Sequence, residues 1–74
     1  MAKTLDLHGV KHGDVPKLLD NFLWEQINRK AREAEIITGL STTMREIVIK
    51  NLKDYDFTYN DGWNNPGKIV VKLT

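Results

Sequence analysis

The amino-acid sequence predicts an α/β fold, a two-layer sandwich in which two helices cover a four-stranded mixed sheet. Three observations predict it. Short runs with a period of two alternate with longer stretches of helical period, in the order β-α-β-α-β-β. The two strand–helix–strand connections, residues 9–34 and 39–55, exceed the roughly dozen residues that a parallel crossover needs. Only residues 61–67 separate the last two strands, which predicts an antiparallel hairpin.

Length and composition limit the classes of protein to which the chain can belong. Its 74 residues suffice for one domain, which we expect to occupy residues 1–74. Cysteine is absent, which excludes disulfides, thiolate catalysis and cysteine-ligated metal sites. No apolar run can cross a bilayer and the first residues carry no secretory signal, so we expect a soluble cytoplasmic domain without a membrane partner. The formal charge of +1 gives no general attraction to a polyanion.

The first half of the chain predicts one strand and one helix. Residues Lys3–Leu7 alternate between polar and apolar, and Gly9 allows the chain to turn after them. Asp14 is a suitable N-cap for a helix over residues 15–31, with Pro16 in its first turn. The apolar stripe of this helix consists of Val15, Leu18, Leu19, Phe22, Leu23 and Ile27.

The second half begins with a strand and a helix. Glu35–Thr38 is rich in β-branched residues, which indicates a buried strand. Ser41, Thr42 or Thr43 can cap the helix that follows, and Thr43 with Glu46 has the spacing of a capping box. The buried stripe of this helix is predicted to consist of Met44, Ile47, Val48, Leu52 and Tyr55.

Three loops are predicted to meet at one edge of the sheet. The hairpin strands are expected at residues 56–60 and 68–73, joined by turn-forming residues. In open α/β sheets, ligands bind beyond the carboxyl ends of the parallel strands. The loops that begin at His8, Thr38 and Asp61 emerge there if the sheet has the predicted order of parallel strands. We therefore expect any functional site at this edge, with both helices on one face.

Asp6 and His8 are the first candidates for chemistry. Because they are two apart on a strand, the carboxylate can orient the imidazole and favour its protonated form. His8 is then a candidate general acid or base. The alternative is a histidine that only ends the strand, with Asp6 bonded to a backbone N–H. His12 could join them around a metal ion, but the spacing matches no specific metal pattern, so we expect no metal.

The segment Thr38–Thr43 is the second candidate. Gly39 followed by a hydroxyl-rich helix start leaves backbone N–H groups free at the positive end of the helix dipole, which suits a phosphate or carboxylate. Simple N-capping explains the same residues equally well, and one site can do both. The segment is not a Walker A loop, because the second Gly-Lys pair is missing.

The polar turn before the last strand is the third candidate. Trp63 could stack on a base, and Asn64 and Asn65 could contact phosphate or base edges. An indole that folds back onto the sheet is the somewhat more common alternative. The cations of residues 29–32 are predicted at the opposite end of the first helix, where the negative end of its dipole explains them.

These motifs resemble those of the small MutS-related (Smr) domain family. The family's Leu-Asp-Leu-His-Gly strand motif matches Leu5–Gly9 at all five positions, and its second strand, Gly turn and helix match Ile36–Arg45 more loosely. The chain also ends similarly, with Gly67 before the strand Ile69–Leu73. The resemblance covers essentially the whole chain. It implies a fold similar to the C-terminal domain of translation initiation factor three.

The resemblance also implies a nucleic-acid-binding domain, since family members bind nucleic acid and several nick DNA or cut RNA. It implies catalytic or substrate-contacting roles for Asp6 and His8. Ser41 stands where the family often has a second glycine, and Leu40 replaces its usual lysine, which removes a cation beside the phosphate. The candidate nucleic-acid-binding residues are Gly9, Thr38, Gly39, Ser41, Thr42, Thr43, Arg45, Trp63, Asn64 and Asn65.

We therefore expect an endonuclease that favours RNA over DNA and needs neither metal nor cofactor. His8, oriented by Asp6, would remove a proton from a ribose 2′-hydroxyl, which attacks the adjacent phosphate. The amides and hydroxyls of residues 39–43 would stabilise the developing charge, with Arg45 as a weaker contributor. The alternative is a non-catalytic module that binds nucleic acid or another protein. A third reading is an accessory domain that binds a metal or small anion.

Overall fold

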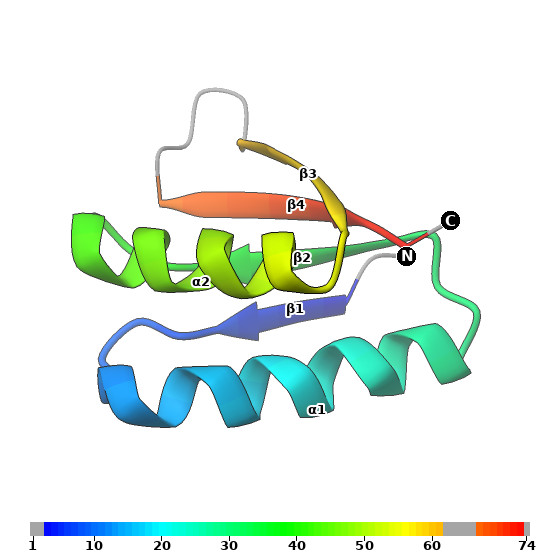
Figure 1. Cartoon of the computed structure of the whole chain (residues 1–74), viewed down its shortest axis with the longest axis horizontal. Helices are drawn as coiled ribbons and strands as arrows, with labels where there is room; N and C mark the ends of the chain where they lie inside the picture. The colour runs from blue at the N-terminus through cyan, green and yellow to red at the C-terminus, as the bar shows by residue number, and fades with distance from the viewer. Residues whose placement is uncertain (1–2, 62–66, 74) are drawn as a thin grey trace.

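A computed structural model describes residues 3–61 and 67–73 and confirms the predicted α/β fold (Figure 1). Two helices and four strands follow one another in the predicted order, with a short 3-10 helix added before the first α-helix. In chain order the elements are β1 (Lys3–Asp6), η1 (His12–Asp14), α1 (Val15–Asn28), β2 (Glu33–Ile37), α2 (Thr42–Asp54), β3 (Thr58–Asp61) and β4 (Lys68–Lys72).

The four strands form one mixed sheet in the order β1-β2-β4-β3. β1 pairs with β2 in parallel, while β4 is antiparallel to both β2 and β3. Because β4 lies between them, β3 runs in the same direction as β2 without pairing with it. The carboxyl ends of β1, β2 and β3 therefore lie at one edge of the sheet, as the topology predicts.

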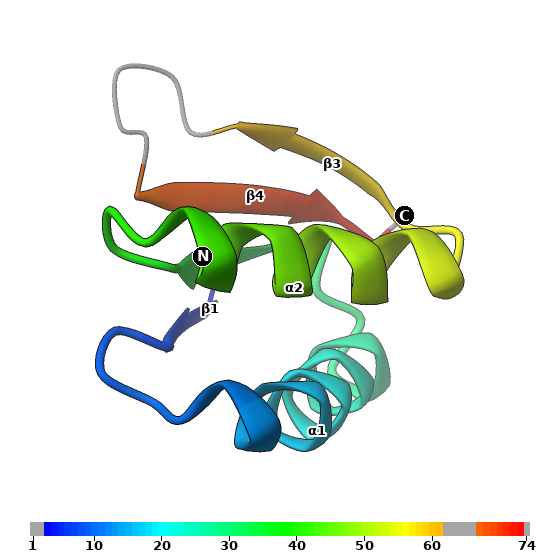
Figure 2. The ribbon, with the colours of Figure 1, turned by 60° about the vertical axis from the view of Figure 1, so that its left-hand side comes forward.

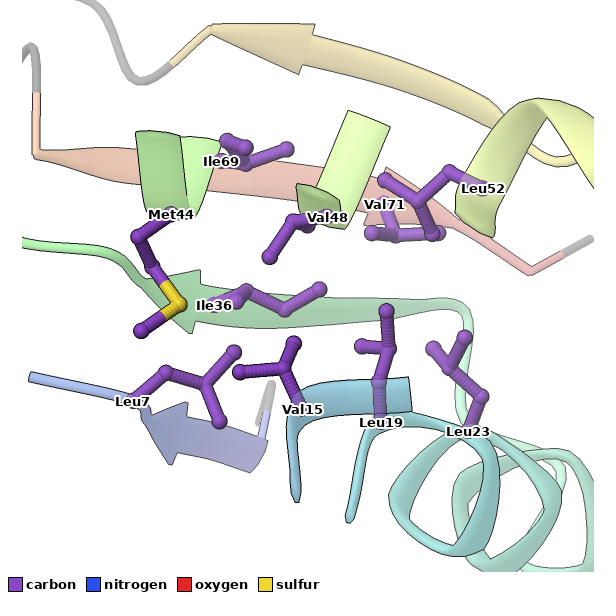
Figure 3. Close-up of a cluster of buried hydrophobic side chains, with 10 residues drawn as sticks. All are labelled: Leu7, Val15, Leu19, Leu23, Ile36, Met44, Val48, Leu52, Ile69 and Val71. Atoms are coloured by element: carbon purple, nitrogen blue, oxygen red, sulfur yellow. The ribbon is translucent and has the colours of Figure 1, made fainter. Parts of the chain in front are cut away.

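Both helices pack on the same face of the sheet, and the core fills the space between the two layers (Figures 2 and 3). Each helix contributes one buried residue per turn, which is the spacing of an amphipathic stripe. The sheet contributes alternate residues of its strands together with Leu7. The buried core cluster consists of Leu7, Val15, Leu19, Leu23, Ile36, Met44, Val48, Leu52, Ile69 and Val71.

Two members of the predicted stripes are exposed. Leu18 is 41% exposed and Tyr55 is 45% exposed. Leu18 precedes the buried Leu19 and lies at the margin of a stripe that α1 keeps narrow. Tyr55 follows the last residue of α2 and serves as its C-cap, so it has left the helical register that buries Leu52. The prediction that Tyr55 belongs to the buried stripe of α2 is therefore wrong, and Leu18 is a solvent-facing member of the apolar stripe of α1.

The other face of the sheet carries an ion pair between neighbouring strands. Glu35, in the middle of β2, pairs with Lys68 across the sheet, with 2.8 Å between Oε1 and Nζ. Thr4 on β1 donates its hydroxyl to the other oxygen of Glu35 at 3.2 Å. The hydrogen bond from Lys68 lowers the pKa of Glu35 from its usual value. The cation of Lys68 is thus held over the open face of the sheet.

Two boundaries differ from the predicted ones because two residues adopt left-handed backbone conformations. Lys30 has a φ of 60°, so α1 stops at Asn28 and does not continue to residue 31. Asp56 has a φ of 61°, so β3 begins at Thr58 and not at residue 56. Asp14 precedes α1 as expected, but its side chain makes no capping hydrogen bond because the residue already belongs to the 3-10 helix η1.

Candidate functional site

The imidazole of His8 lies against the turn that leads into α2. Leu7 N–H donates to the Ile37 carbonyl at 2.8 Å, which continues the parallel pairing of β1 and β2 to the sheet edge. A Cβ placed on Gly39 would lie 3.1 Å from Cδ2 of His8, so the ring rests directly on the Gly39 backbone. His8 is nevertheless exposed. The first two motifs noted in the sequence therefore meet at one edge, and the imidazole remains open to solvent.

Gly67, just before β4, supports the same turn. Its carbonyl oxygen accepts hydrogen bonds from the backbone N–H groups of Thr38 and Gly39, at 2.7 and 3.2 Å. A Cβ placed on Gly67 would lie 3.0 Å from the Gly39 carbonyl oxygen and 3.2 Å from its Cα. The two glycine backbones are thus in direct contact, closer than a side chain on Gly67 would allow. Gly39 itself has a φ of 69°, a conformation that favours glycine.

Sequence reasoning did not assign Gly67 this supporting role. The residue ends a run of turn formers, where a glycine is expected for the turn alone. Its partner, Gly39, follows a different strand, and the contact depends on β4 lying next to β2. The burial of Gly67 in the structure is the feature that separates it from an ordinary turn glycine.

Thr38 lies inside the turn and not on its surface. Its side chain is buried, with 2% of the residue exposed. The hydroxyl donates to the carbonyl oxygens of Gly39 and Gly67, at 3.1 and 3.2 Å. Thr38 therefore ties the turn to the start of β4, and its hydroxyl faces backbone oxygens.

Of the three hydroxyl residues that could cap α2, Ser41 is the N-cap. Its Oγ accepts a hydrogen bond from the backbone N–H of Met44 at 3.1 Å. The next two backbone N–H groups, of Thr42 and Thr43, make no hydrogen bond within the described residues. Both threonines are exposed, so the positive end of the α2 dipole presents unused donors three and four residues after Gly39.

Asp6 acts on the backbone of His8. Its Oδ1 accepts a hydrogen bond from the His8 backbone N–H at 2.9 Å, which closes a turn at the end of β1. In the described part of the chain, no hydrogen bond joins this carboxylate to the imidazole. The arrangement matches the alternative in which the carboxylate is bonded to a backbone N–H.

The remaining candidate residues lie in different surroundings. Gly9 has a φ of 81° and is exposed, and a Cβ there would meet nothing within 4 Å. Leu40 is 84% exposed, between Gly39 and the cap of α2. Arg45 lies in the first turns of α2 and is half-buried. Three candidates of the polar turn lie outside the described residues: Trp63, Asn64 and Asn65.

An exposed imidazole against a turn that leads into unused helix N–H groups is suited to proton transfer near an anion. An imidazole ring can act as a proton acceptor or donor, and N–H groups at a helix N-terminus stabilise negative charge. Among residues 3–61 and 67–73, no group of three His, Asp or Glu side chains is arranged to hold a metal ion. Arg29 and Lys30 follow the C-terminus of α1, at the opposite end of the helix from the His8 loop.

A comparison with known protein families finds one family model that matches the region containing this edge. The model of the Smr domain matches residues 5–73, which is nearly the whole chain. No curated protein and no solved structure matches the chain. No helix in the part of the chain that the structure describes combines the length and apolar character needed to cross a membrane. The matched region includes the end of β1 with the His8 loop, the turn before α2 and Gly67, and therefore the described residues that form the edge.

Proposed function

This chain belongs to the Smr domain family, and we propose that it binds nucleic acid and cleaves RNA in preference to DNA. The proposed site is the edge at which His8 meets the turn that opens α2. The observation that carries the proposal is the contact between the exposed imidazole and Gly39, next to two unused backbone donors. A base and an anion-binding group are two of the components that promote RNA transesterification.

In the proposed reaction His8 acts as the general base. The neutral imidazole removes the proton of a ribose 2′-hydroxyl, and the 2′-oxygen then attacks the adjacent phosphorus. The bond to the 5′-oxygen breaks, a proton from solvent completes the 5′-hydroxyl, and the other product carries a 2′,3′-cyclic phosphate. The backbone N–H groups of Thr42 and Thr43 stabilise the charge that develops on the phosphate oxygens. No step uses a metal ion.

Three further residues have positioning roles in this proposal. Asp6 fixes the backbone of His8 through its hydrogen bond to the N–H group. Thr38 and Gly67 hold the backbone of Gly39, on which the imidazole rests. Because a displacement of about 1 Å can cost on the order of a hundredfold in rate, these contacts matter to catalysis even though they lie behind the reacting atoms.

A non-catalytic binding module is the second candidate. The observation that favours it is the environment of the turn. Leu40, 84% exposed, occupies the tip at which a cation would contact phosphate, and Asp6 is engaged by backbone and not by the imidazole. Such a module would bind nucleic acid or another protein through the same edge, and it would leave RNA intact.

A cleavage assay with two histidine variants tests the proposal. The purified chain is incubated with single-stranded RNA, structured RNA and the corresponding DNA in the presence of a chelator. We expect the chain to cut RNA and leave 2′,3′-cyclic phosphate ends. His8→Ala should lower the rate by about 10²- to 10⁴-fold, the usual contribution of a general base. His12→Ala is the matched control, since His12 is also exposed and lies in η1, and it should keep the wild-type rate.

Other outcomes separate the two candidates. Cleavage that requires a divalent metal, or an unchanged rate in His8→Ala, contradicts the proposed reaction. Salt-dependent binding of RNA or DNA without cleavage supports the non-catalytic module. The absence of both binding and cleavage contradicts nucleic acid as the ligand of this edge.

A further inference from the structure

A small aromatic pocket lies between the two helices, away from His8. It opens in the seam between the second half of α1 and the residues that follow α2, and its volume is about 20 Å³. Tyr55 follows the last residue of α2, whose first residue lies at the His8 edge, so the pocket is about 20 Å from that edge along the helix. The pocket is lined by Asp20, Leu23, Trp24, Ile27, Tyr55 and Phe57.

One carboxylate holds the two most exposed rings of this pocket. Asp20 Oδ1 accepts a hydrogen bond from the Tyr55 hydroxyl at 2.7 Å and another from Trp24 Nε1 at 3.1 Å. Trp24 is 54% exposed and Tyr55 is 45% exposed. Phe57 packs against Tyr55 with 6.1 Å between ring centroids. The rings are therefore fixed in place while about half of their surface faces solvent. Because they are already ordered, little conformational entropy is lost when a ligand binds to them.

The one charged side chain among the described residues that line this pocket is the carboxylate of Asp20. A hydrogen bond to Asp20, together with burial and the charges of Asp20 and Asp54, raises the pKa of the Tyr55 hydroxyl. No lysine or arginine is among the described residues that line the pocket. Arg29, which follows the last residue of α1, is paired with Glu25 at 3.0 Å. Such a pocket attracts cations and repels the phosphates of a nucleic acid, so its preference is opposite to that of the His8 edge.

We propose that this pocket binds a lysine or arginine side chain of a protein partner. The faces of Trp24 and Tyr55 contact the methylene groups and the cation, an arrangement that aromatic rings favour. The second oxygen of Asp20, which has no hydrogen-bond partner in the described part of the chain, pairs with the charge. A volume of about 20 Å³ admits little more than one methyl-sized group, so the charged end lies at the mouth.

Exposed tryptophan and tyrosine are the side chains that most often dominate binding at protein interfaces. The charge of the pocket is the reason for assigning a basic partner and not a nucleic acid. Since the pocket and the His8 edge share none of their described residues, a basic partner and a nucleic acid could be bound at the same time.

A titration with two matched probes tests this assignment. The full chain is titrated with N-acetyl-arginine amide and with N-acetyl-citrulline amide, which has the same shape without the charge. The indole N–H of Trp24 is followed by NMR. We expect a saturable shift with the arginine probe and a much weaker one with the citrulline probe. Asp20→Asn keeps a hydrogen-bond acceptor and removes the charge, so it should weaken arginine binding about fivefold.

Glu46→Gln is the matched control for Asp20→Asn. Glu46 is an exposed carboxylate of α2 that does not line the pocket, so its loss should leave binding unchanged. Equal responses to the two probes, an unshifted Trp24 signal, or an unaltered affinity in Asp20→Asn would each overturn the assignment. A shift of Trp24 by single-stranded RNA that arginine competes away would assign the pocket to nucleic acid instead. The NMR spectrum of each variant also reports whether it is folded.

Discussion

Replacing Gly67 by alanine places a methyl group in the backbone of the neighbouring turn. The new Cβ would lie 3.0 Å from the carbonyl oxygen of Gly39 and 3.1 Å from its carbonyl carbon. Ordinary contacts begin near 3.4 Å, so the backbone of Gly39 must move by about 3.4 − 3.0 = 0.4 Å. Backbone cannot rotate out of the way as a side chain can, and the hydrogen bonds to the Gly67 carbonyl move with it.

The expected loss of stability follows from these two effects. Overpacking of this kind costs about 1–3 kcal/mol, and a weakened hydrogen bond about 1 kcal/mol. We expect Gly67→Ala to lower the free energy of unfolding by about 2 kcal/mol, which in a domain of this size lowers Tm by roughly 8–16 °C. RNA cleavage should fall as well, since the support of His8 moves with Gly39.

Thermal unfolding followed by circular dichroism measures this loss against a matched control. Gly13→Ala makes the same substitution at an exposed position where a Cβ would meet nothing within 4 Å. Its stability should stay within about 0.5 kcal/mol of the wild type. If Gly67→Ala and Gly13→Ala unfold at the same temperature, the close contact between Gly67 and Gly39 is refuted.

Three further predictions concern the same edge and the open face of the sheet. Gly39→Ala should destabilise the chain more than Gly9→Ala. A Cβ in the positive-φ backbone costs about 1–2 kcal/mol at both positions, but only at Gly39 does it also press on the His8 ring. Chemical denaturation of the two variants compares their free energies of unfolding. Thr38→Val should lose about 1 kcal/mol and much of the cleavage rate, and Thr38→Ser, which restores the donor, should recover both. Glu35 has a lowered pKa in the folded state, so its stabilising contribution is present above its unfolded value of 4.5 and is lost as pH falls through the folded pKa. Glu35→Gln should therefore flatten the acid side of a stability–pH profile.

The sequence predicted the layers and the face that each element buries, because burial imposes a period that residues display directly. Leu19 and Val48 lie in the core where the helical period places them. The period does not predict the left-handed conformations of Lys30 and Asp56. These residues lie where the chain leaves a helix and turns toward a strand. The helical spacing also assigns Tyr55 to the buried stripe, although α2 has already ended at Asp54.

The location of the candidate site could be predicted from the sequence, but several of its contacts could not. Topology alone brings His8 and Gly39 to the same edge of the sheet, and the structure shows them touching. The partner of Asp6 could not be chosen from sequence, because a strand end offers its carboxylate both a backbone N–H and an imidazole. The role of Gly67 depends on β4 lying next to β2, a strand order that local pattern does not encode.

The most direct measurement of the central claim is an NMR titration of the chain with a short RNA that carries a 2′-deoxy sugar at one position and cannot be cut there. One ligand should shift the His8 ring signals and the backbone N–H signals of Thr42 and Thr43 together, with a single dissociation constant. Shifts confined to the open face of the sheet, or movement of the imidazole without the two threonine amides, would contradict a shared site.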